Sequence, residues 1–368
     1  MRGATAPLGH SPRPVARLRA RLLVTSPAPR GVWREVLAAD RDGLAFQTPE
    51  WTDAICATGC YEDASRLYET SGGTRMILPL ARRRGPFPRA LAPQGSMPHA
   101  WGMGGVVADA PIEAAELSLV AADLASLPAL RTSIRPNPLQ AGLWAHATEP
   151  LGGTSLPRRA HVLDLQGGID DVWRRAFASS ARRAVRKAQR SRLHVKCGCS
   201  DELLADFHTL LGCSVKRWAH TQHEPLALAR LRARQRYPLA KFQCIAQAMG
   251  ASLRVWVAYR DGVAVASIVV VLGADASYTR GAMDKELAGP VAANELLHWL
   301  AIRDACDAGC RHYHMGESGA SVSLARFKEK LGAQPVAYAE YRFERVALTA
   351  ADAAARGLVK RALRFTDA

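Results

Sequence analysis

The sequence predicts an α/β (α+β) protein built from two similar units in tandem. Its length of 368 residues favours two domains of about 150 residues over one large domain. A succession of helix, β-hairpin, helix and strand is predicted in each half of the chain. The segment 278–333 completes the second succession with a strand, a turn, a long helix, a strand, a polar loop and a short helix. Two copies of one unit explain this pattern better than a single sheet with insertions.

The first half is predicted to begin with short amphipathic helices and to continue with strands. Strands at 65–70 and 75–82 form a hairpin, because the turn Ser71-Gly72-Gly73-Thr74 joins them. A proline-rich loop follows at 85–99. The other predicted elements of this half are helices at 32–39, 50–58 and 111–126 and strands at 101–107 and 132–134.

The second half repeats this plan at a larger scale. A basic helix is predicted at 171–192, and a hairpin is predicted across the turn Asp261-Gly262. The remaining elements are strands at 162–165, 193–196, 252–259 and 264–272, helices that continue to Met249, and a terminal amphipathic helix at 350–365.

The segment 278–333 is the most informative part of the chain. A strand at 278–283 is followed by Gly289-Pro290, which breaks the chain before a helix whose apolar residues recur at helical spacing. The free N–H groups of that helix's first turn would donate hydrogen bonds to a phosphate or a carbonyl oxygen. A strand at 311–315, a small-residue loop at 316–323 and a short helix at 324–331 follow.

Four local motifs of this segment carry a family resemblance. They are Gly281-Ala282-Met283-Asp284, the helix start 290–299, the strand Tyr313-His314-Met315-Gly316 after Gly309, and Arg326-Phe327-Lys328 with Leu331-Gly332-Ala333. The segment resembles the Fem family of peptidoglycan-bridge aminoacyltransferases and the wider group of acyltransferases that share the GNAT fold. Weaker similarity at 46–51, 171–192 and 207–217 extends the resemblance over roughly residues 31–345. It implies tandem GNAT-like domains, each a mixed, mostly antiparallel central sheet flanked by helices.

The predicted division of the chain follows from this resemblance and from composition. Residues 1–30 are expected to be a disordered basic tail, 31–155 the N-terminal GNAT-like domain, 156–346 the C-terminal catalytic domain, and 347–368 a C-terminal helix. No apolar run reaches the roughly 20 residues of a spanning helix. Because residues 1–30 also lack the apolar region of a signal peptide, a cytoplasmic location is expected.

Eight cysteines are expected to be reduced thiols in such a protein. Cys306, Cys310, His312 and His314 have the residue types of a zinc site. However, the cysteines fall on a predicted helix and the histidines on a strand, so that the thiols and the imidazoles point to different places. No metal is therefore predicted.

The positive charge is concentrated in one region. The net charge is +16, and residues 158–192 contain ten Arg or Lys against three Asp. On a helical wheel the basic residues gather opposite an apolar face. This pattern predicts contact with a polyanion such as tRNA, a nucleotide-linked sugar or an anionic membrane surface, and its alternative is an ordinary solvated face. The predicted contact residues are Arg175, Arg182, Arg183, Arg186, Lys187 and Arg190.

Transfer of an acyl group to an amine requires a donor for the developing oxyanion, a proton acceptor and binding groups for both substrates. By the resemblance, Lys328 stabilises charge beside the acyl ester, and Phe327 stacks on the donor. The resemblance also places Arg217, with Trp218, at the phosphates of the acceptor, where a guanidinium can bind bidentately. The alternative for Lys328 is a solvated lysine on a helix, and the alternative for Arg217 is a surface ion pair.

His314 is a further catalytic candidate, because histidine can accept a proton near neutral pH. A buried structural histidine is the alternative. Glu317 is predicted to orient the acceptor or to hold His314, and Asn294 is either a substrate contact or a helix cap. The other predicted substrate-binding residues are Tyr278, Arg280, Ser318 and Arg326.

The favoured function is transfer of an aminoacyl group from aminoacyl-tRNA to an amine of a small metabolite or a cell-wall precursor, with no bound cofactor. The lack of a long helical hairpin favours a small acceptor. An acyl-CoA-dependent N-acyltransferase of polysaccharide or natural-product biosynthesis is the alternative, although Pro290 removes one of the N–H groups that CoA needs. A third class is a non-catalytic protein that binds RNA or a membrane surface. The acyl group, the acceptor and the oligomeric state stay open.

Overall fold

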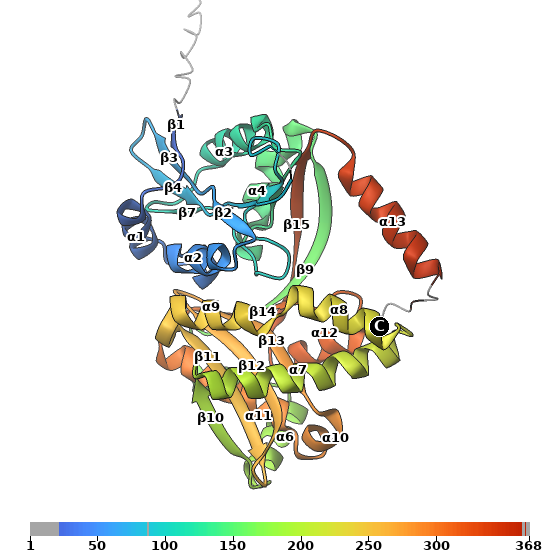
Figure 1. Cartoon of the computed structure of the whole chain (residues 1–368). Helices are drawn as coiled ribbons and strands as arrows, with labels where there is room; N and C mark the ends of the chain where they lie inside the picture. The colour runs from blue at the N-terminus through green and yellow to red at the C-terminus, as the bar shows by residue number, and fades with distance from the viewer. Residues whose placement is uncertain (1–21, 87, 363–364, 366–368) are drawn as a thin grey trace, which may run out of the picture.

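The computed structural model describes residues 22–86, 88–362 and 365. Its first half contains short strands and four α-helices around a small sheet (Figure 1). These elements are β1 Leu22–Thr25, α1 Arg30–Ala39, α2 Pro49–Ala57, β2 Tyr61–Asp63, β3 Arg66–Thr70, β4 Arg75–Leu78, β5 Ala81–Arg83, β6 Gln94–Gly95, β7 Val107–Ala108, α3 Ala114–Ser126, β8 Arg131–Ile134 and α4 Ala141–Thr148.

The second half has longer strands with helices on both faces of the sheet (Figure 1). Its strands are β9 Thr154–Asp164, β10 His194–Gly198, β11 Leu253–Arg260, β12 Val263–Leu272, β13 Ala276–Met283, β14 His312–Glu317 and β15 Gln334–Glu344. Its helices are α5 Gly168–Asp171, α6 Ser179–Gln189, α7 Asp201–Thr221, α8 Leu226–Arg236, α9 Leu239–Met249, α10 Lys285–Ala288, α11 Ala293–Asp307, α12 Val322–Lys330 and α13 Leu348–Ala362.

Two sheets organise these elements, and the predicted fold class is confirmed. One has four strands in the order β1-β3-β4-β7, and the other has eleven in the order β10-β11-β12-β13-β14-β9-β15-β8-β6-β5-β2. Both predicted hairpins form, as β3–β4 and β11–β12. Neighbouring strands are antiparallel except at β13–β14 and β6–β8. The sheets are therefore mixed and mostly antiparallel.

Two long strands join the halves into one sheet. β9 pairs with β14 of the second half through residues 160–164 and with β15 over residues 154–162. β15 then continues into the first half, where Tyr341–Glu344 pair with β8. Figure 1 shows both strands running from one half to the other. The predicted boundary at residue 155 thus lies inside β9.

The structure corrects several predicted elements. The tail does not extend to residue 30, because β1 pairs with β3 and α1 begins at Arg30; residues 1–21 lie outside the described residues. The strand predicted at 101–107 is reduced to β7. The basic helix is interrupted, since a π-helical turn at Val172–Ala176 ends in the extended residues before α6. The long helix begins at Ala293, after a 3₁₀ turn at Gly289–Val291.

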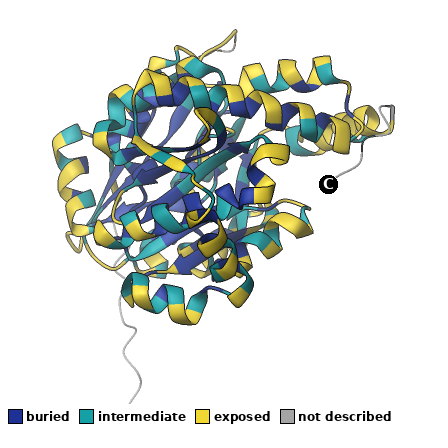
Figure 2. Cartoon of the chain, turned by 90° about the horizontal axis from the view of Figure 1, so that it is seen from below, coloured by how far each residue is buried: buried dark blue, intermediate teal, exposed yellow. Residues whose placement is uncertain are grey.

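Apolar side chains fill both faces of the large sheet. One core lies under α7 and α9 and includes Phe207 and Phe242, whose ring centroids are 4.9 Å apart. The other lies under α6 and α11 and includes Val185 and Leu297. Figure 2 shows this buried layer between helices whose outer faces are exposed. Within the described ranges, no helix combines the length and the apolar character that a membrane crossing requires.

Gly332 fixes α12 against the π-helical turn. Its φ is +90°, and a Cβ at this position would lie 2.6 Å from the Ala176 Cβ and 3.0 Å from the Ala176 backbone. We expect Gly332→Ala to lower the free energy of unfolding by about 2 kcal/mol, because it adds backbone strain to this overlap. Urea denaturation followed by circular dichroism measures the loss. Gly289→Ala is the control, since no atom lies within 4 Å of its Cβ, and an equal loss in both variants would contradict the explanation.

Candidate active site

A cleft opens where β13 and β14 separate. The two parallel strands pair only at Ala276–Tyr313 and Ser277–His314 and then diverge. The cleft has a volume of about 820 Å³ and is lined by the ends of both strands, by α7, α9 and α12, and by first-half residues 100–103. On either side of the divergence, α11 packs on β11 and β12, and α12 packs on β9 and β15. The cleft is large enough for two substrates to meet.

Lys328 occupies the wall of this cleft that α12 supplies. Ser321 caps the helix by accepting a hydrogen bond from the Leu324 N–H. The Lys328 side chain is 1% exposed, and its Nζ donates to the backbone oxygens of Gly316 at 2.9 Å and Glu317 at 2.8 Å. Burial lowers the pKa of Lys328 to about 7. Because an ammonium has three N–H donors, one remains for a substrate.

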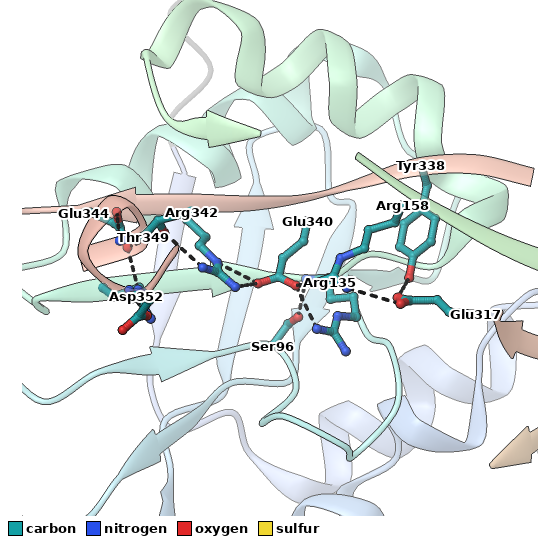
Figure 3. A network of polar contacts seen from close by, with 11 residues as sticks. Ser96, Arg135, Arg158, Glu317, Tyr338, Glu340, Arg342, Glu344, Thr349 and Asp352 are labelled. Atoms are coloured by element: carbon teal, nitrogen blue, oxygen red, sulfur yellow. Dashed lines mark hydrogen bonds and ion pairs between the residues drawn. The ribbon is translucent and has the colours of Figure 1, made fainter. Parts of the chain in front are cut away.

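Glu317 lies beside Lys328 and belongs to a long ionic network. Its carboxylate accepts from Tyr338 Oη at 2.5 Å and from Arg158 Nη1 at 3.2 Å. Arg158 also donates to Glu340, whose carboxylate is further bound by Arg135 and Arg342 (Figure 3). Burial alone would raise the pKa of Glu340, but these arginines lower it to about 2. The network fixes the position of the Glu317 carboxylate, and no hydrogen bond or ion pair of the described residues joins this carboxylate to His314.

Ser318 connects the cleft to a buried histidine. Its Oγ lies 3.3 Å from Nδ1 of His161, which β9 supplies and which is fully buried. The other ring nitrogen, Nε2, is 3.6 Å from Glu329, and that carboxylate is 46% exposed. Burial, with a contribution from Lys328, lowers the pKa of His161. These three side chains form a polar route from the cleft to solvent.

An aromatic group closes the cleft behind Lys328. The Tyr278 ring lies 4.7 Å from the ring of His298, which lies 5.4 Å from the ring of Phe327. Burial raises the pKa of Tyr278 to about 12 and lowers that of His298 to about 3. Gly281 leaves room for the Tyr278 hydroxyl, with which a Cβ would overlap. Tyr278 and Phe327 both line the cleft, and their role as substrate contacts stays a prediction.

The structure also brings other predicted binding residues to the cleft. Arg217 Nη1 donates to the Met283 backbone oxygen at 3.1 Å, and burial lowers the pKa of Arg217. Trp218, Arg280 and Asn294 line the same cleft, Asn294 from the first turn of α11. Each of the three side chains is partly buried.

Two predicted residues do not reach the cleft. His314 is 1% exposed and binds Asp275 through Nε2 at 3.1 Å, on the same side of β14 as His312, because residues two apart on a strand share a face. The prediction that His314 is catalytic is therefore wrong, because its side chain does not reach the cleft. The alternative, a buried structural histidine, agrees with its contacts. Arg326 is exposed on α12 and is not among the residues that line the cleft.

The basic residues surround a separate depression of about 530 Å³ at the start of α6, which Arg182, Arg183 and Arg186 line together with Trp173 and Arg174. Arg182 Nη1 donates to two backbone oxygens, and the Arg186 guanidinium lies 5.9 Å from the Trp173 ring. Three other predicted contacts, Arg175, Lys187 and Arg190, are exposed, and Arg175 is paired with Asp171.

Sequence reasoning missed several residues of the cleft. Lys241 on α9, Trp101 and Tyr237 line it, and His161 and Arg158 support it from β9. Lys241 carried a usable signal, because it is the one charged residue of α9 and stands next to Phe242; in the structure its side chain is 5% exposed. His161 and Arg158 carried no such signal in the sequence, since only the pairing of β9 with β14 brings them to the site.

Comparisons with known proteins agree with this architecture. Residues 175–329 match the family model of the acetyltransferase (GNAT) domain. The fold is similar to the crystal structure of FemX, with a TM-score of 0.66 and 12% identity over 88% of this chain and 97% of that one.

Two further structures have the same fold. A tandem GNAT protein from the clavulanic acid biosynthesis pathway matches with a TM-score of 0.50 and 14% identity over 88% and 98% of the two chains. A conserved protein of unknown function from Bacteroides thetaiotaomicron matches with a TM-score of 0.52 and 8% identity over 87% and 99%. No curated protein matches the chain. Residues 175–329 are thus similar to the acetyltransferase (GNAT) domain, and the chain has the fold of FemX and of a tandem GNAT protein.

Proposed function

We propose that the protein is an N-acyltransferase that moves an aminoacyl group from aminoacyl-tRNA to an amine of a small metabolite or a cell-wall precursor. The observation that carries this proposal is Lys328, a buried ammonium with one free N–H in a cleft large enough for two substrates. The second half of the chain then supplies the catalytic groups. Since charged tRNA is the donor, we also propose that the protein acts in the cytoplasm.

The geometry suits attack of an amine on an ester carbonyl. The amine nitrogen bonds to the carbonyl carbon, and the free N–H of Lys328 donates to the oxyanion that forms. The proton lost by the amine passes to Ser318 and His161, which burial keeps neutral. As the tetrahedral intermediate collapses, the ester C–O bond breaks and the leaving ribose oxygen takes up the proton that His161 returns through Ser318. Glu317, held by Arg158 and Tyr338, orients the attacking amine.

The start of α11 supports an ester donor over acyl-CoA. Pro290 has no N–H, and the Ala292 N–H donates to the Gly289 oxygen at 3.2 Å inside a 3₁₀ turn. Fewer consecutive N–H groups are therefore left for a pyrophosphate than at an ordinary helix start. The match to the acetyltransferase domain family is the observation that favours acyl-CoA as the second candidate donor.

The experiment that tests the donor is filter binding of the purified protein to aminoacylated and uncharged tRNA at about 50 and 200 mM salt. Non-specific phosphate contacts weaken steeply over this range. Tighter binding of the charged form at the higher salt supports an aminoacyl donor. Equal binding that salt abolishes contradicts it, and acyl-CoA donors should then be assayed against the same amines.

The exposed residues of α6 provide a second test of tRNA contact. We expect the combined change Arg183→Gln, Lys187→Gln and Arg190→Gln to weaken tRNA binding and to lower the slope of log K against log salt by up to about 3, because each phosphate contact contributes about 0.9. A control removes the same charge from exposed residues of the first half, through Arg41→Gln, Arg83→Gln and Arg84→Gln. Equal slopes in the two variants would mean that net charge alone attracts the tRNA.

A further inference from the structure

Within the described residues, several cations that line the cleft form no ion pair, Lys328 and Arg217 among them. Some partly buried cations are paired: Arg135, which also lines the cleft, binds Glu340 at 2.7 Å, and Arg131 binds Glu344 at 2.5 Å. Lys241 and Arg280 form no ion pair within the described part of the chain, although both line the cleft. Glu224, an acid near the same helices, is occupied by Arg232 at 2.6 Å.

Lys241 is buried at the end of the cleft that the first half closes. Its side-chain Nζ donates to the Ala100 backbone oxygen at 2.5 Å and lies 4.2 Å from the centre of the Trp101 ring. Burial, with a contribution from the charge of Arg280, lowers the pKa of Lys241 to about 7. Its position therefore costs free energy that no acid among the described residues offsets.

Arg280 faces the same aromatic ring as Lys241. Its guanidinium lies 4.0 Å from the centre of the Tyr237 ring, and Nη2 donates to the Tyr237 hydroxyl. The Lys241 Nζ lies 5.6 Å from that ring centre. The Arg280 Nε is buried without a hydrogen-bond partner. Two like charges thus converge on one aromatic side chain, and one of them has an unused donor.

We infer that Lys241, Arg280 and the rings of Trp101 and Tyr237 form a binding subsite for an anionic group, a carboxylate or a phosphate, on one of the substrates. An anion between the two cations would neutralise their repulsion and satisfy the free donor. Phe46, Trp51 and Phe242 line the same region, so that the anion is carried by an apolar or planar body. The assignment of this subsite to the acceptor substrate rests on the proposed function. The binding of an anion there does not depend on it.

The test measures anion binding to the full-length protein without any catalytic assay. Isothermal titration calorimetry with inorganic phosphate and with succinate, at constant ionic strength in KCl, should show saturable binding of at least one of them. Lys241→Met and Arg280→Gln should each weaken this binding at least about tenfold, since each removes a charge-assisted hydrogen bond. Arg326→Gln loses the same charge on an exposed residue outside the cleft and should bind as the wild type does.

Each outcome decides the inference. Binding of phosphate alone or of succinate alone supports the subsite and assigns its ligand class. No saturable binding, or equal weakening in Arg326→Gln, overturns it. Circular dichroism of the variants shows whether they fold; if Lys241→Met does not, Arg280→Gln carries the test. Specific anion binding without any aminoacyl transfer would reject the proposed function and leave the subsite standing.

Discussion

Lys328→Met is expected to lower kcat for aminoacyl transfer by about 100-fold or more, with little change in KM. The substitution keeps the length of the side chain but removes the N–H that is aimed at the oxyanion, and loss of one such donor costs about 10²–10³ in kcat. Single-turnover transfer from charged tRNA to a saturating amine measures the effect. Lys330→Met, an exposed change two residues away on α12, is the control and should retain the wild-type rate.

The pH dependence distinguishes this role from that of a general base. The pKa of Lys328 is lowered to about 7, so the ammonium that donates to the oxyanion is lost as pH rises through this value. The ratio of kcat/KM in the wild type to that in Lys328→Met should therefore fall above pH 7, whatever the ionisation of the amine, which affects both proteins equally. A ratio that rises with pH would show that Lys328 accepts a proton instead.

Asp275→Asn is expected to lower the free energy of unfolding by about 3 kcal/mol, the cost of breaking a buried ion pair. The Asp275 carboxylate is fully buried and accepts from the His312 backbone N–H at 2.9 Å, from His312 Nδ1 and from His314 Nε2. Urea denaturation at pH 6 measures the loss. Asp304→Asn is the control, because its pair with Arg254 is partly exposed and should contribute less than about 1 kcal/mol.

Stability should depend on pH through the same cluster. Burial alone would raise the pKa of Asp275, but hydrogen bonds from His312 and His314 lower it from an ordinary 3.8 to about 2. This contribution is complete above about pH 4 and is lost as pH falls toward 2. The bond to Asp275 raises the pKa of His312 above its ordinary 6.5, so its contribution is complete below 6.5 and is lost as pH rises through the raised value. Asp275→Asn should reduce the loss of stability at both the acidic and the basic end of the pH range. An unchanged pH dependence of stability would contradict this account.

Local pattern was sufficient to predict the central part of the site. The helical spacing after Gly289-Pro290, the strand before Gly316 and the short helix that bears Lys328 are all present, because each depends on residues that are close in sequence. Lys328 was identified through the motif that surrounds it. Its burial and its two backbone acceptors depend on the sheet, and no periodicity indicates them.

The errors share a physical origin in long-range pairing. His314 was assigned to the site from its place on β14, but which face of a strand meets the cleft is decided by register with β9 and β13. Lys241 was not assigned to the site, because its burial requires the first-half residues Ala100 and Trp101. The boundary at residue 155 fell within a strand because β9 has partners at both of its ends.

β15 has a consequence for how the chain is made. Its residues Tyr341–Glu344 supply the partner of β8, yet the ribosome produces them only after nearly all of the second half. At about 5–20 residues per second, β8 waits on the order of 10 to 40 seconds for this partner. During that time its edge presents unpaired N–H and C=O groups that can pair with strands of other nascent chains. The early half of the protein is thus completed by one of its last strands, and its risk of aggregation is greatest before that strand emerges.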